Sequence, residues 1–209
     1  MSAPIRVVLA SHNAHKLVEL QRILGDALDG IELVSYDGPE PVENGLGFEE
    51  NALIKARAAA EFTGLPSIAD DSGICVDVLG GSPGIFSARW SGPAKDAGEN
   101  LRLLLWQLTD VDDPHRTAHF TAAAALVVPA GAASGGREIA EAVLGEWPGR
   151  ILTAPAGEHG FGYDPIFAPE GADGRSAAEL SDAEKDAESH RRRAFDALVP
   201  RLRSALGLG

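Results

Sequence analysis

A short polar segment near the start of the chain could bind an anion. Ser11-His12-Asn13-Ala14-His15-Lys16 follows the apolar run 6–10 and precedes apolar residues at helical spacing, so a strand is expected to give way to a helix here. A helix N-terminus presents free backbone N–H groups that bind phosphates, and Lys16 adds a full positive charge beside them. The alternative is an ordinary capped helix with a solvated lysine.

Two adjacent carboxylates, Asp70 and Asp71, are flanked by the apolar residues 68–69 and 74–76. Burying them without partners is costly, and successive side chains of an extended strand point to opposite faces. We therefore expect the two to have different partners. One could hold Mg²⁺, which prefers carboxylate and phosphate oxygens, and the other could pair with a cation or a structural N–H. An acidic turn at a strand end is the alternative.

Aromatic side chains between glycines form a third cluster, Gly160-Phe161-Gly162-Tyr163-Asp164-Pro165-Ile166-Phe167. Glycine permits close approach of the backbone to a ligand. Phe161 or Tyr163 could stack on a planar base, because every nucleobase offers such a face. The alternative is an aromatic turn that packs on the core.

A fourth cluster is basic and comprises Lys185 and the run from Ser189 to Arg193. Consecutive arginines fan out around a helix, so they cannot all serve one site, and solvated surface is the alternative for most of them. Lys185 and His190 are five residues apart, which a straight helix would not align. Both can reach one pocket only if the helix breaks near Ser189.

Alternating αβ units and a hairpin are predicted to position these clusters. The expected strands are 6–10, 67–69, 74–78, 119–128 and 138–144, and the expected helices are 17–24, 49–62, 99–108 and 195–206. A glycine-rich connection, 131–136, favours a β-hairpin, Ser181 and Glu184 have the spacing of a capping box, and Pro200 should kink or divide the last helix. The pattern predicts an α/β domain with a mixed sheet.

Composition limits the partners of such a domain. The formal charge is −13 and the pI about 4.8, which disfavours nucleic acid and anionic membranes as partners but not a small anion held by a few local cations. The longest apolar stretch, 122–128, is too short to span a bilayer, and the single Cys75 cannot form an internal disulfide. We expect a soluble cytoplasmic protein.

The motifs, taken in order, closely resemble the RdgB/Ham1 (inosine triphosphate pyrophosphatase) family from Val7 to about Ala194. They are SHNAHK (11–16), FEENALIKARAAA (48–60), SIADDSGICVDVLGGSPGIFSARW (67–90), GEWPGRI (145–151), PAGEHGFGYDPIF (155–167) and SHRRRAF (189–195). The resemblance implies one α/β domain over residues 1–209, in which a central long mixed β-sheet carries two α/β lobes flanking a cleft. It also implies magnesium and a homodimer.

Roles for individual residues follow from the same resemblance. Asp71, Asp70 and Lys16 are expected to be catalytic, and Asp71 and Glu43 to hold the metal. The expected substrate-binding residues are Ser11, His12, Asn13, Lys16, Lys55, Ser72, Arg89, Phe161, Gly162, Tyr163, Asp164, Lys185, His190 and Arg191. His12 departs from the family pattern, which commonly has a small residue at this position.

The implied reaction is hydrolysis of non-standard purine nucleoside triphosphates, ITP, dITP and XTP, to the monophosphate and pyrophosphate. Positioning and electrostatics dominate phosphoryl chemistry. Asp71 is expected to hold magnesium and orient the water that attacks the α-phosphorus. Asp70 is expected to be a second metal-shell acid or the partner of a lysine. His190 or Arg191 could donate to the purine O6 and so oppose adenine.

Three other functions remain alternatives. A pyrophosphatase of the Maf type would prefer other bases, a nucleotide-binding module would not catalyse, and a structural protein would use none of these clusters. Adjacent carboxylates favour catalysis, because a protein that only binds a polyanion gains nothing from extra acids.

Overall fold

The computed structural model describes residues 3–12, 14–131 and 135–208, and of Ala14 and His15 it describes the backbone alone. The chain divides into two compact units, which we treat separately. Unit 1 comprises Met1–Asp71, Ala122–Gly145 and Arg191–Gly209, and unit 2 comprises Ser72–Thr121 and Glu146–His190.

Seven strands pair in one mixed sheet in the order β2-β1-β3-β5-β6-β7, and β4 pairs with β3. The strands are β1 (Ile5–Leu9), β2 (Ile31–Ser35), β3 (Ser67–Val76), β4 (Ser82–Pro83), β5 (Thr117–Val128), β6 (Ile139–Ile151) and β7 (Phe167–Pro169). The α-helices are α1 (Ala14–Leu24), α2 (Phe48–Thr63), α3 (Ala97–Gln107), α4 (Asp182–Glu188) and α5 (His190–Ala205). Strand β1 is parallel to β2 and β3, whereas β4 is antiparallel to β3 and β7 to β6. The predicted mixed sheet is therefore confirmed.

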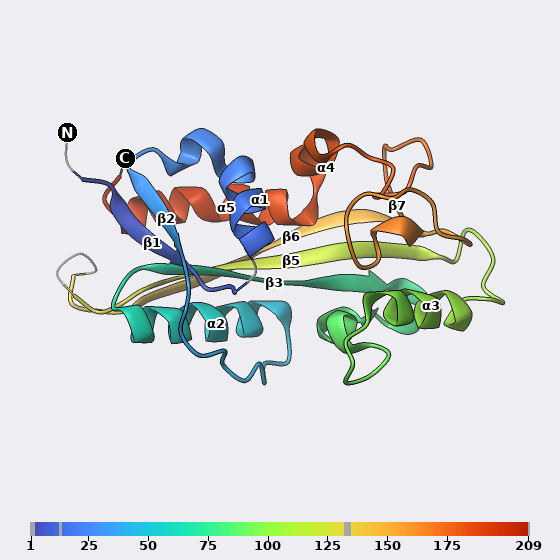
Figure 1. The fold of residues 1–209 in the computed structure, drawn as a ribbon, viewed down its shortest axis with the longest axis horizontal. Coiled ribbons are helices and arrows are strands. Elements are labelled where there is room, and N and C mark those ends of the chain that lie inside the picture. Colours follow the sequence, from blue (N-terminus) through green and yellow to red (C-terminus); the bar gives the residue numbers. More distant parts are fainter. Residues whose placement is uncertain (1–2, 13, 132–134, 209) are drawn as a thin grey trace. The chain divides into compact units, whose positions relative to one another are not determined.

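Unit 1 covers both faces of its strands with helices, α1 and α5 on one face and α2 on the other (Figure 1). Residues of β5 alternate between the two cores. Ala124 and Leu126 pack with the α1 and α5 side, while Ala123 and Ala125 pack with alanines of α2. Small side chains on both surfaces let the helix lie close to the sheet, which explains the alanine-rich sequence of β5.

Unit 2 packs α3 against β3, β5 and β6 through a separate core that contains Trp147, Phe167 and Leu104. Arg116 is buried in this unit, and its guanidinium donates to the carbonyl oxygens of Leu108, Val111, Ile151 and Leu152. Two of these carbonyls lie at the end of α3 and just beyond it, where helix geometry leaves them without helical donors.

The predicted strands are confirmed in kind, but several of their bounds were wrong. Residues on both sides of Asp70 and Asp71 belong to the single strand β3, and β6 extends to Ile151 instead of ending near residue 144. We did not predict β2. The helix α2 ends as expected at Gly64, whose φ of 70° is the left-handed conformation that glycine adopts without strain.

The C-terminal helices match one expectation and narrow another. Ser181 and Glu184 form the predicted capping box, and α4 ends so that Ser189 separates it from α5. Of the two outcomes expected at Pro200, a kink or a division of the last helix, division does not occur, because α5 continues from His190 to Ala205. Pro200 lies on the exposed side of α5, where water can satisfy the carbonyl that a proline leaves without a donor. No helix in the described part of the chain is long and apolar enough to cross a bilayer.

Candidate active site

Asp70 and Asp71 point to opposite faces of β3 and have different partners, as predicted. Asp70 faces α1 and α5, and its carboxylate accepts from Lys16 Nζ at 3.0 and 3.1 Å. Its side chain is only 4% exposed. Of the two roles considered for Asp70, the structure therefore supports the lysine partner.

Arg191 is the second cation on Asp70 and belongs to a chain of alternating charges. Its Nε and Nη2 donate to Asp70 Oδ2 at 3.2 and 3.1 Å, and its Nη1 donates to Glu19 Oε1 at 2.8 Å. Burial alone would raise the pKa of Asp70, but Lys16 and Arg191 outweigh it and hold that pKa well below its usual range. Lys16 is thus held by a carboxylate that stays ionised at neutral pH.

Asp71 lies on the α2 side of β3 and faces another lysine. Lys55 Nζ donates to Asp71 Oδ1 at 2.8 Å and lies 3.7 Å from Glu43 Oε1, while Asn51 Nδ2 donates to Asp71 Oδ2 at 3.4 Å. Burial lowers the pKa of Lys55, but Asp71, Asp70 and Glu43 outweigh burial and raise it. Two carboxylates that were predicted to hold the metal therefore converge on one cation.

This convergence fits a magnesium site that needs a substrate to complete it. Magnesium is commonly bound through one or two carboxylates together with substrate phosphates, while several of its ligands remain water. Asp71 and Glu43 supply two carboxylates around a positive charge. Among the side chains that the structure describes, no three of His, Cys, Asp or Glu cluster as metal ligands. A magnesium ion held by Asp71 and Glu43 would take its other ligands from the triphosphate and from water.

His12 contacts the loop after β2. Its Nδ1 lies 3.0 Å from Glu40 Oε1, its Nε2 lies 2.8 Å from the Gly38 carbonyl oxygen, and its ring stacks on Tyr36. Both ring nitrogens of His12 are therefore engaged in this conformation, and its substrate-binding role stays a prediction. Asn13 lies outside the described residues.

Unit 2 brings together Phe161, Asp164 and Lys185. Lys185 Nζ donates to Asp164 Oδ2 at 2.5 Å and lies 5.4 Å from the centre of the Phe161 ring. Asp164 also accepts from the backbone N–H of Phe161 at 2.8 Å, which fixes the turn around Gly162. The Phe161 side chain is 65% exposed, so a face of its ring is available to a ligand.

The other predicted aromatic contacts are internal to unit 2. Tyr163 is 6% exposed, and its hydroxyl donates to the Ser87 carbonyl at 2.9 Å, so of the two rings predicted to stack on a base only that of Phe161 is exposed. Burial raises the pKa of Tyr163. His190 is also buried, and its ring stacks on Phe120 with 4.8 Å between ring centres.

The structure thus gathers the predicted residues in two groups. Unit 1 holds Ser11, His12, Lys16, Glu43, Lys55, Asp70, Asp71 and Arg191, and unit 2 holds Ser72, Arg89, Phe161, Gly162, Tyr163, Asp164, Lys185 and His190. Arg89 is exposed and lies over the ring of Phe86, at 5.3 Å from its centre.

Sequence reasoning missed Glu19, Asn51 and Ser87. Glu19 is three residues after Lys16 on α1, and Asn51 is four residues before Lys55 on α2. Residues at these spacings share a helix face, so each could have been found from the lysine. Ser87 acts through its backbone carbonyl, and no sequence pattern marks it.

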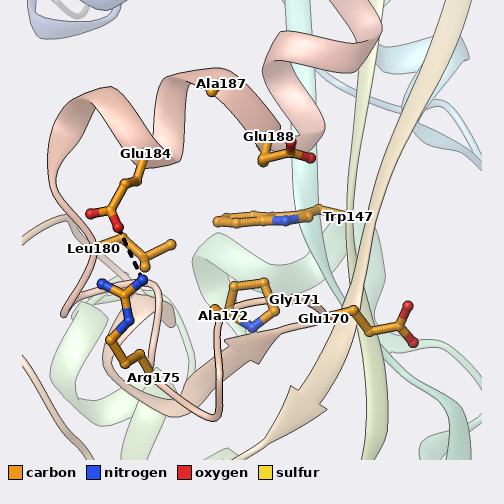
Figure 2. A pocket seen from close by; sticks show the side chains of 10 residues that line it. Trp147, Glu170, Gly171, Ala172, Arg175, Leu180, Glu184, Ala187 and Glu188 are labelled. Atoms are coloured by element: carbon orange, nitrogen blue, oxygen red, sulfur yellow. Dashed lines mark hydrogen bonds and ion pairs between the residues drawn. The ribbon is translucent and has the colours of Figure 1, made fainter.

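A cavity of about 410 Å³ lies elsewhere in unit 2, and none of the predicted site residues line it. Figure 2 shows Trp147 between α4 and the turn at Gly171 and Ala172, with Arg175 paired to Glu184 at the rim. Two more carboxylates, Glu170 and Glu188, also line this cavity. Three acids against one paired cation make it a poor site for a triphosphate.

Comparisons with known proteins identify the family of this chain. The Ham1 family model matches residues 7–201. A dITP/XTP pyrophosphatase of Leifsonia xyli subsp. xyli is 60% identical over 200 residues, which cover 96% of each chain. A dITP/XTP pyrophosphatase of Streptomyces coelicolor is 52% identical over 206 residues, which cover 97% of this chain and 99% of the relative.

Solved structures show the same fold. A HAM1 protein from Coxiella burnetii superposes with a TM-score of 0.83 at 39% identity, covering 96% of this chain and 99% of that one. A nucleoside-triphosphatase, or dITP/XTP pyrophosphatase, from Mycobacterium abscessus has a TM-score of 0.74 at 50% identity, covering 94% and 100%. With a matching family model and relatives that align over nearly their whole length, this chain belongs to the Ham1 family.

Proposed function

We propose that this protein hydrolyses dITP, XTP and ITP to the nucleoside monophosphate and pyrophosphate, and so removes deaminated purines from the nucleotide pool. The proposal rests on the different partners of the two adjacent carboxylates of β3. Asp70 is fully occupied with Lys16 and Arg191, which leaves Asp71 to face Lys55 and Glu43. The names of the relatives support the substrate class.

Unit 1 supplies the groups for the triphosphate in this proposal. Lys16 and Lys55 bind phosphate oxygens, and Asp71 and Glu43 hold Mg²⁺, which when bound neutralises charge on the phosphates. Asp71 orients the attacking water and accepts its proton. The water oxygen bonds to the α-phosphorus as the bond to the β-phosphate oxygen breaks, and pyrophosphate leaves.

Unit 2 supplies the groups for the base. The exposed Phe161 ring stacks on the purine, a contact that holds any base without selecting among them. Lys185 lies beside that ring and donates to O6, which hypoxanthine and xanthine present as an acceptor and adenine replaces by an amino donor. Arg191 is directed at Asp70 and Glu19, so we assign it to positioning Lys16 and not to reading the base.

Pyrophosphate release tests the proposal. We expect Mg²⁺-dependent release from dITP, XTP and ITP that exceeds release from ATP. A buried mismatch of about 1–3 kcal/mol corresponds to discrimination of about 5- to 150-fold. Undetectable release from the first three substrates would refute it. A preference for pyrimidine nucleotides would instead favour the Maf-type alternative, and binding without release would favour a nucleotide-binding module.

We further propose that the protein is a cytoplasmic homodimer and that residues 1–209 act as one pyrophosphatase domain. These proposals rest on the resemblance to the family. Sedimentation velocity at micromolar concentration measures the oligomeric state directly, and a monomeric mass of 21.8 kDa would contradict the dimer.

A further inference from the structure

We propose that His12 is a positioning residue. It fastens the loop of residues 36–47, which carries Glu43, to the phosphate-binding loop, by which we mean residues 11–16. This inference rests on the proposed function, because that function assigns Glu43 to the metal. His12 lies in the phosphate-binding loop, next to Ser11, and it contacts Gly38 and Glu40 across 26 and 28 residues of sequence.

Both ring nitrogens of His12 face atoms that only accept hydrogen bonds. Nδ1 faces a carboxylate oxygen of Glu40 at 3.0 Å, and Nε2 faces the carbonyl oxygen of Gly38 at 2.8 Å. A neutral imidazole carries one N–H and one lone pair, so it can satisfy only one of these oxygens. The imidazolium donates to both, and the contact therefore fits the charged form of His12.

Tyr36 is a buried residue that holds both His12 and the start of the loop in place. It is buried among Val8 and Ala59, its ring stacks on His12 with 5.4 Å between ring centres, and its hydroxyl donates to the Pro39 carbonyl at 2.8 Å. A Cβ at Gly38 would lie 2.5 Å from the Tyr36 hydroxyl oxygen, so only glycine fits beside this ring. The start of the loop is thus held on both sides of the carbonyl that His12 contacts.

The other end of the loop is tied to the start of α2. The backbone N–H of Gly45 donates to Asn51 Oδ1 at 2.9 Å, and that of Leu46 donates to Glu50 Oε2 at 2.6 Å. Glu43 lies between this attachment and the one at Glu40. Releasing the His12 attachment should therefore loosen Glu43 and leave Lys55, which belongs to α2, in place.

Charge makes the attachment depend on pH. Hydrogen bonds to Glu40 and to the Gly38 carbonyl, together with the negative charges of Glu40 and Asp37, raise the pKa of His12 above 6.5. Because the pKa is raised, His12 is fully charged and the attachment complete below about pH 6.5. The attachment is lost as the pH rises through the pKa of His12 in the folded protein.

The first test observes the histidine without any reaction. Long-range ¹H–¹⁵N spectra across a pH series give the imidazole pKa of each of the six histidines, and His12→Gln identifies the signal of interest. We expect the pKa of His12 to lie above 6.5 in the wild type and to fall in Glu40→Gln. A pKa at or below 6.5, or one that Glu40→Gln leaves unchanged, overturns the proposal.

The second test measures kcat, the KM for dITP and the Mg²⁺ concentration for half-maximal turnover. We expect His12→Gln and Glu40→Gln each to raise that Mg²⁺ concentration about two- to fivefold at pH 6.5, as for an exposed charge pair. The wild type should approach the variants as the pH rises. His12→Lys keeps the charge and should hold the wild-type value at pH 6.5 and also at pH 9. His115→Gln, an exposed histidine of unit 2, serves as the matched control.

Direct binding of phosphate by His12 gives the opposite pattern. Glu40→Gln would then free the ring and leave the KM for dITP unchanged or lower, while His12→Gln raised it, and this result overturns the positioning role. Equal Mg²⁺ requirements in wild type and His12→Gln also overturn it. A wild type that releases no pyrophosphate contradicts the proposed function alone, since the imidazole pKa values still decide whether the attachment exists.

Discussion

Unit 1 contains a buried ion pair of two predicted site residues, whereas the residue of unit 2 that we expect to meet the base is an exposed aromatic ring. Asp70 and Arg191 are each 4% exposed at the side chain and hold one another, while Phe161 is 65% exposed. Buried ion pairs lose much stability when one partner is removed, and exposed rings lose little. Removing one partner of the buried pair in unit 1 should therefore cost much stability, whereas removing the exposed ring in unit 2 should cost little.

Asp71→Asn should give the largest effect on turnover. It keeps the size of the side chain but removes the charge that we assign to the metal and to the water, so kcat for dITP should fall about 10²- to 10⁴-fold. Steady-state pyrophosphate release measures this fall, and circular dichroism checks the fold. Asp77→Asn, an exposed acid of unit 2, is the matched control and should retain activity. Near wild-type kcat in Asp71→Asn would refute the role of Asp71.

Asp70→Asn should give the largest effect on stability. It leaves Lys16 and Arg191 without their shared carboxylate, and breaking a buried pair costs about 3–5 kcal/mol. Urea unfolding at pH 7 measures the loss. If Asp70→Asn were as stable as the wild type, the buried network could not be what holds Lys16.

The pH dependence of stability provides a second test of Asp70. Its pKa is lowered in the folded protein, so its contribution is complete above the unfolded value of about 3.9 and is lost as the pH falls through the folded value. The stability difference between wild type and Asp70→Asn should therefore shrink below about pH 4. A difference that stayed constant to pH 2 would contradict the lowered pKa.

Features that depend on residues close together in sequence could be predicted, whereas contacts between distant residues could not. Successive side chains of a strand alternate between its faces, so the opposite orientations of Asp70 and Asp71 could be predicted. The capping box at Ser181 could be predicted because it involves only four consecutive residues. The partners of Arg191 could not be foreseen, because Asp70 and Glu19 are 121 and 172 residues away in sequence. The burial of Tyr163 beside an exposed Phe161 likewise depends on tertiary packing.

Phe161→Ala should affect the substrate affinity of unit 2 with little effect on stability. Loss of one stacking contact of about 1–3 kcal/mol should raise the KM for dITP about 5- to 150-fold. Thermal unfolding should change little, because the ring is exposed. Trp106→Ala removes another exposed aromatic ring of unit 2 and is the matched control. An unchanged KM in Phe161→Ala would exclude stacking on this ring.

Tyr163→Phe should give a smaller effect than Phe161→Ala on the KM for dITP and separates the two neighbouring aromatic residues. It removes the hydroxyl that donates to the buried Ser87 carbonyl, which should cost about 0.5–1.5 kcal/mol of stability and leave the KM for dITP unchanged. Tyr36→Phe removes a comparable hydroxyl of unit 1, whose bond to the Pro39 carbonyl is less buried, so it should cost less. Urea unfolding of both variants gives this order. A KM that rose in Tyr163→Phe as much as in Phe161→Ala would mean that both rings contact the base, and the contrast between a buried and an exposed aromatic residue would then fail.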